Sequence, residues 1–260
     1  MPRLARRAVL AVSAFAGPAF ASDPAADLPV VAAASDLLFA LEEISRRFEA
    51  EGFGRVRLSF GSSGNLARQI EQGAPFQMFL SADESFVFRL AERGLTRDRG
   101  ALYAIGRIVI FVPPHSDLEP DGTLADLAAA IADNRLRRFA IANPEHAPYG
   151  MAAMQALRSR GLWQGVQRAL VLGETVSQAA QFAATGNSQG GIIARSLALA
   201  PALRSRGRFG VIPEEFHEPL RQRMVLLRNA GPTAERFYAF LQQYAARETM
   251  ARFGFGLPDV

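Results

Sequence analysis

Apolar runs and amphipathic stretches alternate along almost the whole chain. The apolar runs are rich in β-branched residues and predict strands, and the segments between them have helical spacing. The expected strands are residues 28–34, 55–60, 76–82, 102–113, 137–143, 168–173, 189–194, 209–213 and 221–228. After Ser35, apolar side chains recur on one helical face, at Leu37, Leu41, Ile44 and Phe48. This regular alternation predicts an α/β fold with mostly parallel sheets flanked by helices.

One expected strand is unusually long. Residues 102–113 contain Gly106 in their interior, and a segment of this length can leave one sheet and enter another. A return crossing at residues 219–228 would complete this topology. The sequence therefore predicts two lobes with a ligand cleft between them. Lobe 1 is expected at residues 28–108 and 222–260, and lobe 2 at residues 109–221.

The first 21 residues differ in character from the rest. They contain Arg3, Arg6 and Arg7 and no acidic residue, followed by a short apolar segment and an Ala-Phe-Ala sequence that ends at Ala21. This order predicts a secretory signal peptide cleaved near Ala21, and hence a periplasmic location. The adjacent Arg6 and Arg7 leave twin-arginine export open beside the ordinary route.

Removal of this segment changes the charge argument. The formal charge of +4 includes its three arginines, so the exported chain carries only about +1. This balance does not favour nucleic acid or a membrane surface as a partner, and no later apolar run has the length to span a membrane. The chain contains no cysteine, which excludes disulfides and a lipid-attachment cysteine. We expect a monomer without stable membrane insertion.

Four expected strands pass into helices, and small hydroxyl residues stand at the first two of these junctions. Ser35 follows the first strand, Ser62 and Ser63 follow the second, and Tyr149 and Val176 begin two later helices. A helix N-terminus offers unpaired backbone N–H groups and a partial positive charge. Taken singly, each serine is readily explained as an N-cap, but recurrence at four junctions favours an anion held between the lobes by neutral donors.

Several of these stretches resemble the molybdate-binding proteins of bacterial ABC importers, over essentially the whole chain after residue 21. The resemblance is carried by AAASDL (32–37), FGSSGNLARQIEQGAPF (60–76), FLSAD (79–83), NPEHAPYG (143–150) and the GII near residue 191. It implies the two-lobed periplasmic-binding-protein fold of type II and capture of molybdate or tungstate. It also implies two protein partners, the permease of the importer and its ATPase.

By motif position, the same resemblance implies the binding residues. Ser35 and Ser63 would donate to the oxyanion from lobe 1, and Tyr149 and Val176 would donate from lobe 2, chiefly through backbone N–H groups. Asp36 and Ser62 are weaker candidates. Molybdate would be the transported ligand, so neither a cofactor nor a direct side-chain ligand to the metal is implied.

Three positions depart from the pattern of this family: Gln77, where an aspartate is usual and which bears on lobe packing, and two positions that bear on the ligand. Ala194 stands where many members have a tyrosine whose hydroxyl contacts the ligand, and the Tyr149 hydroxyl is a candidate replacement. Asp36 stands where an uncharged residue is common, and its carboxylate would repel a dianion unless it points away. A different oxyanion or a small organic anion therefore remains an alternative ligand for the same fold.

Two other classes of protein compete with a binding protein. A serine hydrolase needs an activated nucleophile, but GSSG is not a G-x-S-x-G motif, lysine is absent, and no spacing pairs His146 with Ser35 or Ser63. A ligand-sensing domain of a regulator can share the fold, but the export signal and the lack of a DNA-binding segment count against it. The sequence therefore predicts a binding protein rather than an enzyme.

Overall fold

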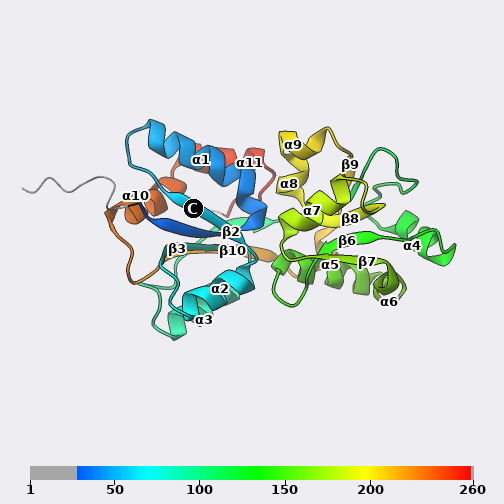
Figure 1. Cartoon of the computed structure of the whole chain (residues 1–260), viewed down its shortest axis with the longest axis horizontal. Coiled ribbons are helices and arrows are strands. Elements are labelled where there is room, and N and C mark those ends of the chain that lie inside the picture. The colour runs from blue at the N-terminus through cyan, green and yellow to red at the C-terminus, as the bar shows by residue number, and fades with distance from the viewer. Residues whose placement is uncertain (1–27, 259–260) are drawn as a thin grey trace, which may run out of the picture.

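The computed structural model describes residues 28–258, so the expected signal peptide and its cleavage position lie outside the described residues. Within this range the strands form two five-stranded sheets, each flanked by helices, and the two resulting lobes lie side by side (Figure 1). We call the lobe built on β1 (Val30–Ala34) lobe 1 and the lobe built on β6 (Phe139–Ala142) lobe 2. The predicted two-lobed α/β fold is confirmed.

Lobe 1 contains a sheet with the strand order β2-β1-β3-β10-β4. Besides β1, its strands are β2 (Arg57–Gly61), β3 (Phe76–Ser81), β4 (Ala101–Gly106) and β10 (Leu220–Leu226). Its helices are the 3-10 helix η1 (Ser35–Leu37), α1 (Leu38–Ala50), α2 (Ser63–Glu71), α3 (Glu84–Glu92), α10 (Pro232–Leu241) and α11 (Tyr244–Arg252).

Lobe 2 contains a sheet with the strand order β7-β6-β8-β5-β9. Besides β6, its strands are β5 (Ile108–Val112), β7 (Leu170–Gly173), β8 (Gly190–Ala194) and β9 (Arg208–Val211). Its helices are α4 (Ala125–Ala132), α5 (Pro148–Ser159), α6 (Trp163–Val166), α7 (Val176–Ala184), α8 (Arg195–Leu199) and α9 (Pro201–Arg204), with 3-10 helices η2 (Gln167–Ala169) and η3 (Glu214–Phe216).

Both sheets are mixed but mostly parallel in strand direction, as the sequence predicts, because a single strand in each runs against the other four. In lobe 1, β1 is parallel to β2 and β3, while β10 is antiparallel to β3 and β4. In lobe 2, β6 is parallel to β7 and β8, while β5 is antiparallel to β8 and β9. The antiparallel pairings thus involve the strands that follow a crossing between lobes. Such a strand enters its sheet from the end at which the parallel strands finish, so it runs against them.

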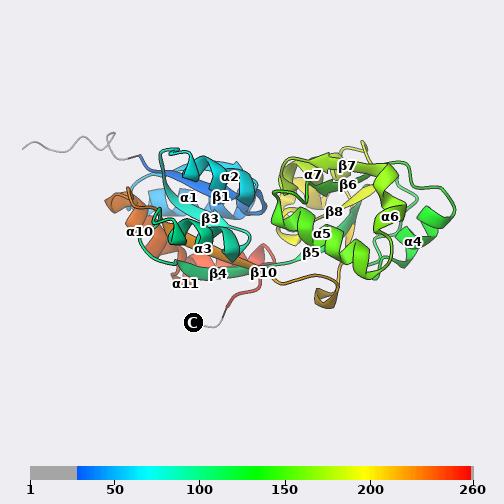
Figure 2. The same cartoon turned by 90° about the horizontal axis from the view of Figure 1, so that it is seen from below.

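The chain crosses between the lobes twice. The expected continuous strand at residues 102–113 is instead two strands, because β4 ends at Gly106 in one sheet and β5 begins at Ile108 in the other. The return crossing lies between β9 and β10 (Figure 2). Gly106 is required at the first crossing, since a Cβ atom there would lie 2.5 Å from the Tyr149 hydroxyl. The residue boundaries expected for the lobes remain predictions.

Helices cover both faces of the lobe 1 sheet, which fixes its strands from two sides. Val31 and Ala33 of β1 pack in one core cluster with α1, α10 and α11, while the intervening Ala32 packs in another with α2 and α3. The apolar residues predicted to share one helical face after Ser35 are all buried in the first cluster. Within residues 28–258, no helix combines the length and apolarity needed to cross a membrane.

Candidate functional site

The four strand-to-helix junctions singled out by sequence meet at the boundary between the lobes. Lobe 1 contributes η1, which follows β1, and the start of α2, which follows β2; lobe 2 contributes the starts of α5 and α7. These elements line one interlobe cavity of about 10 Å³. All six candidate residues line this cavity, namely Ser35, Asp36, Ser62, Ser63, Tyr149 and Val176. This volume is about that needed by one water molecule, so the closed lobes pack tightly around the site and exclude a bulky guest.

Local sequence explains why the helices begin at the cavity. Ser62 is in an extended conformation before α2, and Pro148, whose ring presets the helical φ, opens α5. Thr175 caps α7, because its side chain accepts a hydrogen bond from the backbone N–H of Gln178. Each of the three helices has at least nine residues, so its N-terminal partial charge is developed at the cavity.

The hydroxyl groups of Ser35 and Ser63 are both held by backbone donors. Ser63 Oγ accepts a hydrogen bond of 2.9 Å from Ala82 N, and Ser35 Oγ accepts one of 3.3 Å from Ser177 N. Both serines are buried. A hydroxyl has one proton and two lone pairs, so accepting an N–H positions the oxygen and leaves the proton available. Each serine can therefore donate a hydrogen bond to an anion in the cavity.

Lobe 2 presents backbone N–H groups to the same cavity. Tyr149 and Val176 lie in the first turns of α5 and α7. The N–H groups of a first helical turn have no intrahelical acceptor and need another partner. Among the described residues that line the cavity, none has a cationic side chain. The arrangement therefore offers an anion neutral O–H and N–H donors rather than a countercharge.

Asp36 is a fully buried carboxyl group beside these donors. Its Oδ2 accepts hydrogen bonds from the Tyr149 hydroxyl at 2.9 Å and from Gln222 Nε2 at 2.7 Å. Burial raises the pKa of Asp36 to about 6, although both hydrogen bonds act in the opposite direction. The Tyr149 hydroxyl is thus engaged by Asp36 and is not the free ligand donor that the sequence suggests in place of a tyrosine at Ala194.

Gln222 and Tyr103 complete the buried network, and sequence reasoning missed both. Gln222 on β10 is fully buried and also donates to the Tyr149 hydroxyl oxygen at 2.9 Å. Its Oε1 accepts a hydrogen bond of 2.7 Å from the Tyr103 hydroxyl on β4. The available signal was a glutamine at an inward position of the apolar run at residues 220–226, where a buried amide requires partners.

Further contacts join the lobes around the cavity. Gly64 N donates to the carbonyl oxygen of His146 at 3.0 Å, and Ser62 Oγ lies 2.9 Å from His146 Nδ1. His146 Nε2 also lies 3.3 Å from a carboxylate oxygen of Glu174. Ser62 therefore contacts the opposite lobe through its side chain. Because the contacts of Gly64 and Ser62 with His146 link different lobes, they require the lobes to be closed together, whereas the contact between His146 and Glu174 lies within lobe 2.

The segment that follows the position of the family tyrosine contacts lobe 1. Ala194 is buried at the end of β8, and Arg195 opens α8 but does not line the cavity. The next residue, Ser196, donates from its hydroxyl to the backbone carbonyl of Asp36 at 2.8 Å. Through this hydrogen bond, Ser196 of lobe 2 helps to hold the two lobes together.

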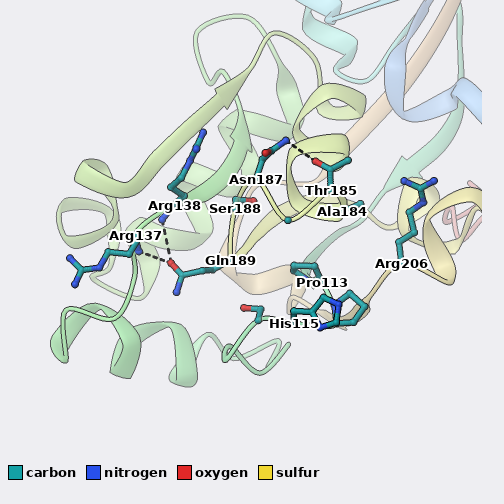
Figure 3. A pocket seen from close by; sticks show the side chains of 13 residues that line it. Pro113, His115, Arg137, Arg138, Ala184, Thr185, Asn187, Ser188, Gln189 and Arg206 are labelled. Atoms are coloured by element: carbon teal, nitrogen blue, oxygen red, sulfur yellow. Dashed lines mark hydrogen bonds between the residues drawn. The ribbon is translucent and has the colours of Figure 1, made fainter.

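A larger hollow of about 770 Å³ lies at the opposite end of the lobe 2 sheet (Figure 3). Its lining includes Arg137, Arg138 and Arg206, whose side chains point apart rather than toward a common centre. The C-terminal end of α7 lies at this hollow, and the partial charge of a helix C-terminus is negative. Neither feature provides converging donors for a small anion, so the interlobe cavity is the candidate site.

The fold and this cavity define a two-lobed solute-binding protein. Residues 29–256 match the family described as bacterial extracellular solute-binding protein, so the chain belongs to that family and is a binding protein rather than an enzyme. Within it, the chain belongs with the molybdate-binding proteins, as three comparisons show.

Two relatives are named molybdate-binding protein ModA. The protein of Azotobacter vinelandii is 34% identical over 230 residues, which cover 87% of this chain and 89% of the relative. The protein of Rhodobacter capsulatus is 33% identical over 236 residues, which cover 89% of this chain and 90% of the relative. The solved structure of the periplasmic molybdate-binding protein of Azotobacter vinelandii superposes with a TM-score of 0.79 at 29% identity, covering 89% of this chain and 100% of that one.

Proposed function

We propose that this protein captures molybdate between its lobes and delivers it to an ABC importer. The single observation that carries this proposal is the convergence of four helix-starting junctions, two from each lobe, on one small cavity without a cationic side chain. The names of the relatives above supply the identity of the anion. The geometry supplies a means of holding it.

Binding would use neutral donors from both lobes. Ser35 and Ser63 would donate their hydroxyl protons, and Tyr149 and Val176 would donate backbone N–H groups. Hydrogen bonds to an ionised acceptor are shorter and stronger than those between neutral groups. Neutral donors also reject an anion that keeps its own protons, because a donor facing another donor has no acceptor.

Size would set the choice among oxyanions. Tungstate has the same charge as molybdate and nearly the same size, so we propose that it also binds. Sulfate is smaller, and donors fixed on two closed lobes could not all reach its oxygens. The small volume of the cavity disfavours an organic anion with a bulky body.

The family description and the predicted signal peptide both support a location outside the cytoplasm, which we propose to be the periplasm. The partners would be a permease and its ATPase. Contacts such as that from Gly64 to His146 form only when the lobes close, so closure would create the surface that the permease recognises. We propose that the protein acts as a monomer.

Isothermal titration calorimetry tests the proposed ligand. Purified protein is titrated with molybdate, tungstate and sulfate at one pH and ionic strength. We expect heat and one-to-one stoichiometry with molybdate and tungstate, and a much weaker response to sulfate. Clear heat from another anion with none from molybdate would reassign the ligand while leaving the class of protein unchanged.

A further inference from the structure

This inference rests on the proposed function and concerns the same cavity. We propose that Asp36 binds the anion as a neutral carboxylic acid that donates a hydrogen bond from Oδ1, so that capture of one dianion takes up one proton. Asp36 would then be a ligand donor and a determinant of specificity. The protonation is a simple proton uptake from solvent; no bond within the anion changes.

The hydrogen-bond pattern assigns the proton to one oxygen. The Tyr149 hydroxyl and Gln222 Nε2 both point donors at Asp36 Oδ2. Gln222 also donates to the Tyr149 oxygen, so the Tyr149 proton is directed toward Asp36. With two donors aimed at Oδ2, that oxygen acts only as an acceptor. The proton of a neutral Asp36 therefore resides on Oδ1.

Oδ1 is the atom that lacks a partner. It is buried and makes no hydrogen bond with any described residue, while Asp36 itself lines the interlobe cavity. A buried polar atom without a partner is unfavourable. An oxygen of a bound anion would supply the missing acceptor for an Oδ1–H group. An ionised Oδ1 would instead place like charges together, with no cation among the cavity-lining residues to separate them.

The surroundings of the carboxyl group contain no competing charge. The side chains that face it are Tyr103 from β4, Tyr149 from α5 and Gln222 from β10. The backbone N–H groups of Asp36 and Leu37 also act on the carboxyl and lower its pKa, and Ser196 from α8 bonds the backbone carbonyl. Burial and the Asp36 charge raise the pKa of both tyrosines, so neither ionises near neutral pH. Helix α7 has no titratable residue, and Arg195 of α8 lies against Gly254.

The expected consequence is a pH-dependent affinity. Burial already raises the pKa of Asp36 to about 6, and an adjacent dianion would raise it further. Above that pH the free protein is ionised at Asp36 and must gain a proton to bind. The Kd for molybdate should therefore rise by roughly tenfold for each pH unit between about pH 7 and about pH 8.

Calorimetry in buffers of different ionisation enthalpy directly measures the number of protons taken up when molybdate binds. At about pH 8, we expect the wild-type protein to take up about one proton per molybdate. The variant Asp36→Asn, which keeps a neutral N–H donor at this position, should bind with no proton uptake and with a Kd independent of pH. The matched control Glu119→Gln removes an exposed carboxylate paired with Arg208 and should behave as wild type.

Two further variants separate Asp36 from its neighbours. Tyr149→Phe removes a donor that lowers the pKa of Asp36, so proton uptake should shift to higher pH, whereas a merely structural role would leave the proton count unchanged. His146→Gln should retain the uptake of one proton, because His146 contacts Ser62 rather than Asp36. If Asp36→Asn does not fold, the proton counts of Tyr149→Phe, His146→Gln and the wild-type protein still test whether Asp36 takes up the proton.

Tight molybdate binding by the wild-type protein without proton uptake would overturn this inference and leave the proposed function standing. Uptake that persists in folded Asp36→Asn, or that disappears in His146→Gln, would also overturn it. Absence of molybdate binding at every pH would instead remove the proposed function, on which the inference rests.

Discussion

The backbone N–H of Gly64 in lobe 1 donates a hydrogen bond to the backbone carbonyl of His146 in lobe 2 over 3.0 Å. Gly64 lies in the first turn of α2, directly after Ser63, and His146 precedes the start of α5. Two helix N-termini are thereby brought face to face. Because backbone groups make this bond, the close approach depends on the lack of a side chain at Gly64.

Gly64→Ala should weaken anion binding without harming the fold of lobe 1. A Cβ atom at this position would lie 2.8 Å from the His146 carbonyl oxygen, closer than real contacts allow. Relief of such a clash typically costs about 1–3 kcal/mol, and it applies only to the closed state. We therefore expect the Kd for molybdate to rise by roughly ten- to a hundredfold by calorimetry.

The stability of the Gly64→Ala variant supplies an internal check. Alanine favours helix more than glycine does, so thermal unfolding of the ligand-free variant should not occur at a lower temperature. Gln69→Ala, on the exposed side of the same helix, is the matched control and should bind as wild type. Wild-type affinity in Gly64→Ala would show that this contact does not limit closure.

Ser63→Ala should lower both affinity and stability. The substitution removes a hydroxyl donor at the cavity and leaves the buried Ala82 N–H without its acceptor. An unsatisfied buried donor costs about 1–3 kcal/mol, which should appear as a lower free energy of unfolding in urea. Loss of the hydroxyl donor should raise the Kd at least about tenfold.

Ser45→Ala is the matched control for Ser63→Ala. Ser45 bonds only a carbonyl of its own helix, that of Glu42, so neither the Kd nor the free energy of unfolding should change by more than a small amount. An unfolding free energy that falls in Ser63→Ala while the Kd stays constant would assign Ser63 a structural role alone.

The sequence predicted the junctions of the cavity because their chemistry is local. A strand that ends at Ser35 or at Ser62 passes into a helix within a few residues, and the resulting N-termini are visible as hydroxyl and proline positions along the chain. The α/β alternation, in turn, predicted that parallel strands deliver these junctions to one edge. Their convergence on one cavity follows from both patterns together.

The sequence did not reveal the network beneath the cavity, because its partners are far apart along the chain. Asp36, Tyr149 and Gln222 lie in three different elements, and nothing in their spacing shows that they meet. The same holds for Ser62 and His146, which face each other only after the lobes close. The break at Arg107 was missed for a similar reason, since only pairing in two sheets divides one apolar run into two strands.

The arginine-lined hollow of lobe 2 should take no part in molybdate binding. It lies at the opposite end of the sheet, and the four residues of β6 alone span about 13 Å. Exposed charges are largely screened beyond about 10 Å at 0.1 M salt. Replacing Arg137, Arg138 and Arg206 together with glutamine should therefore leave the Kd within about twofold of wild type in calorimetry. A loss of affinity of tenfold or more would assign this hollow a share in binding.

Asp36 should make the ligand-free protein less stable as the pH rises. Its pKa is raised from 3.8 to about 6 by burial, so between these values the folded protein holds a proton that the unfolded chain has lost. The free energy of unfolding therefore falls by up to roughly 3 kcal/mol across this window and stays constant above it. Asp36→Asn lacks this titration, so it should gain stability relative to wild type from about pH 4 to about pH 7.

Urea unfolding of ligand-free protein across this pH range measures the difference between Asp36→Asn and wild type. Subtraction of the two curves cancels titrations elsewhere in the chain. Asp121→Asn gives a control of opposite sign, because hydrogen bonds from Thr123 and the following backbone lower the pKa of Asp121. Its ionised form stabilises the fold, so this variant should be less stable than wild type by a constant amount above about pH 4, and the difference should shrink as the pH falls below 3.8. A difference for Asp36→Asn that stays flat with pH would mean that the buried carboxyl group does not hold its proton in the folded state.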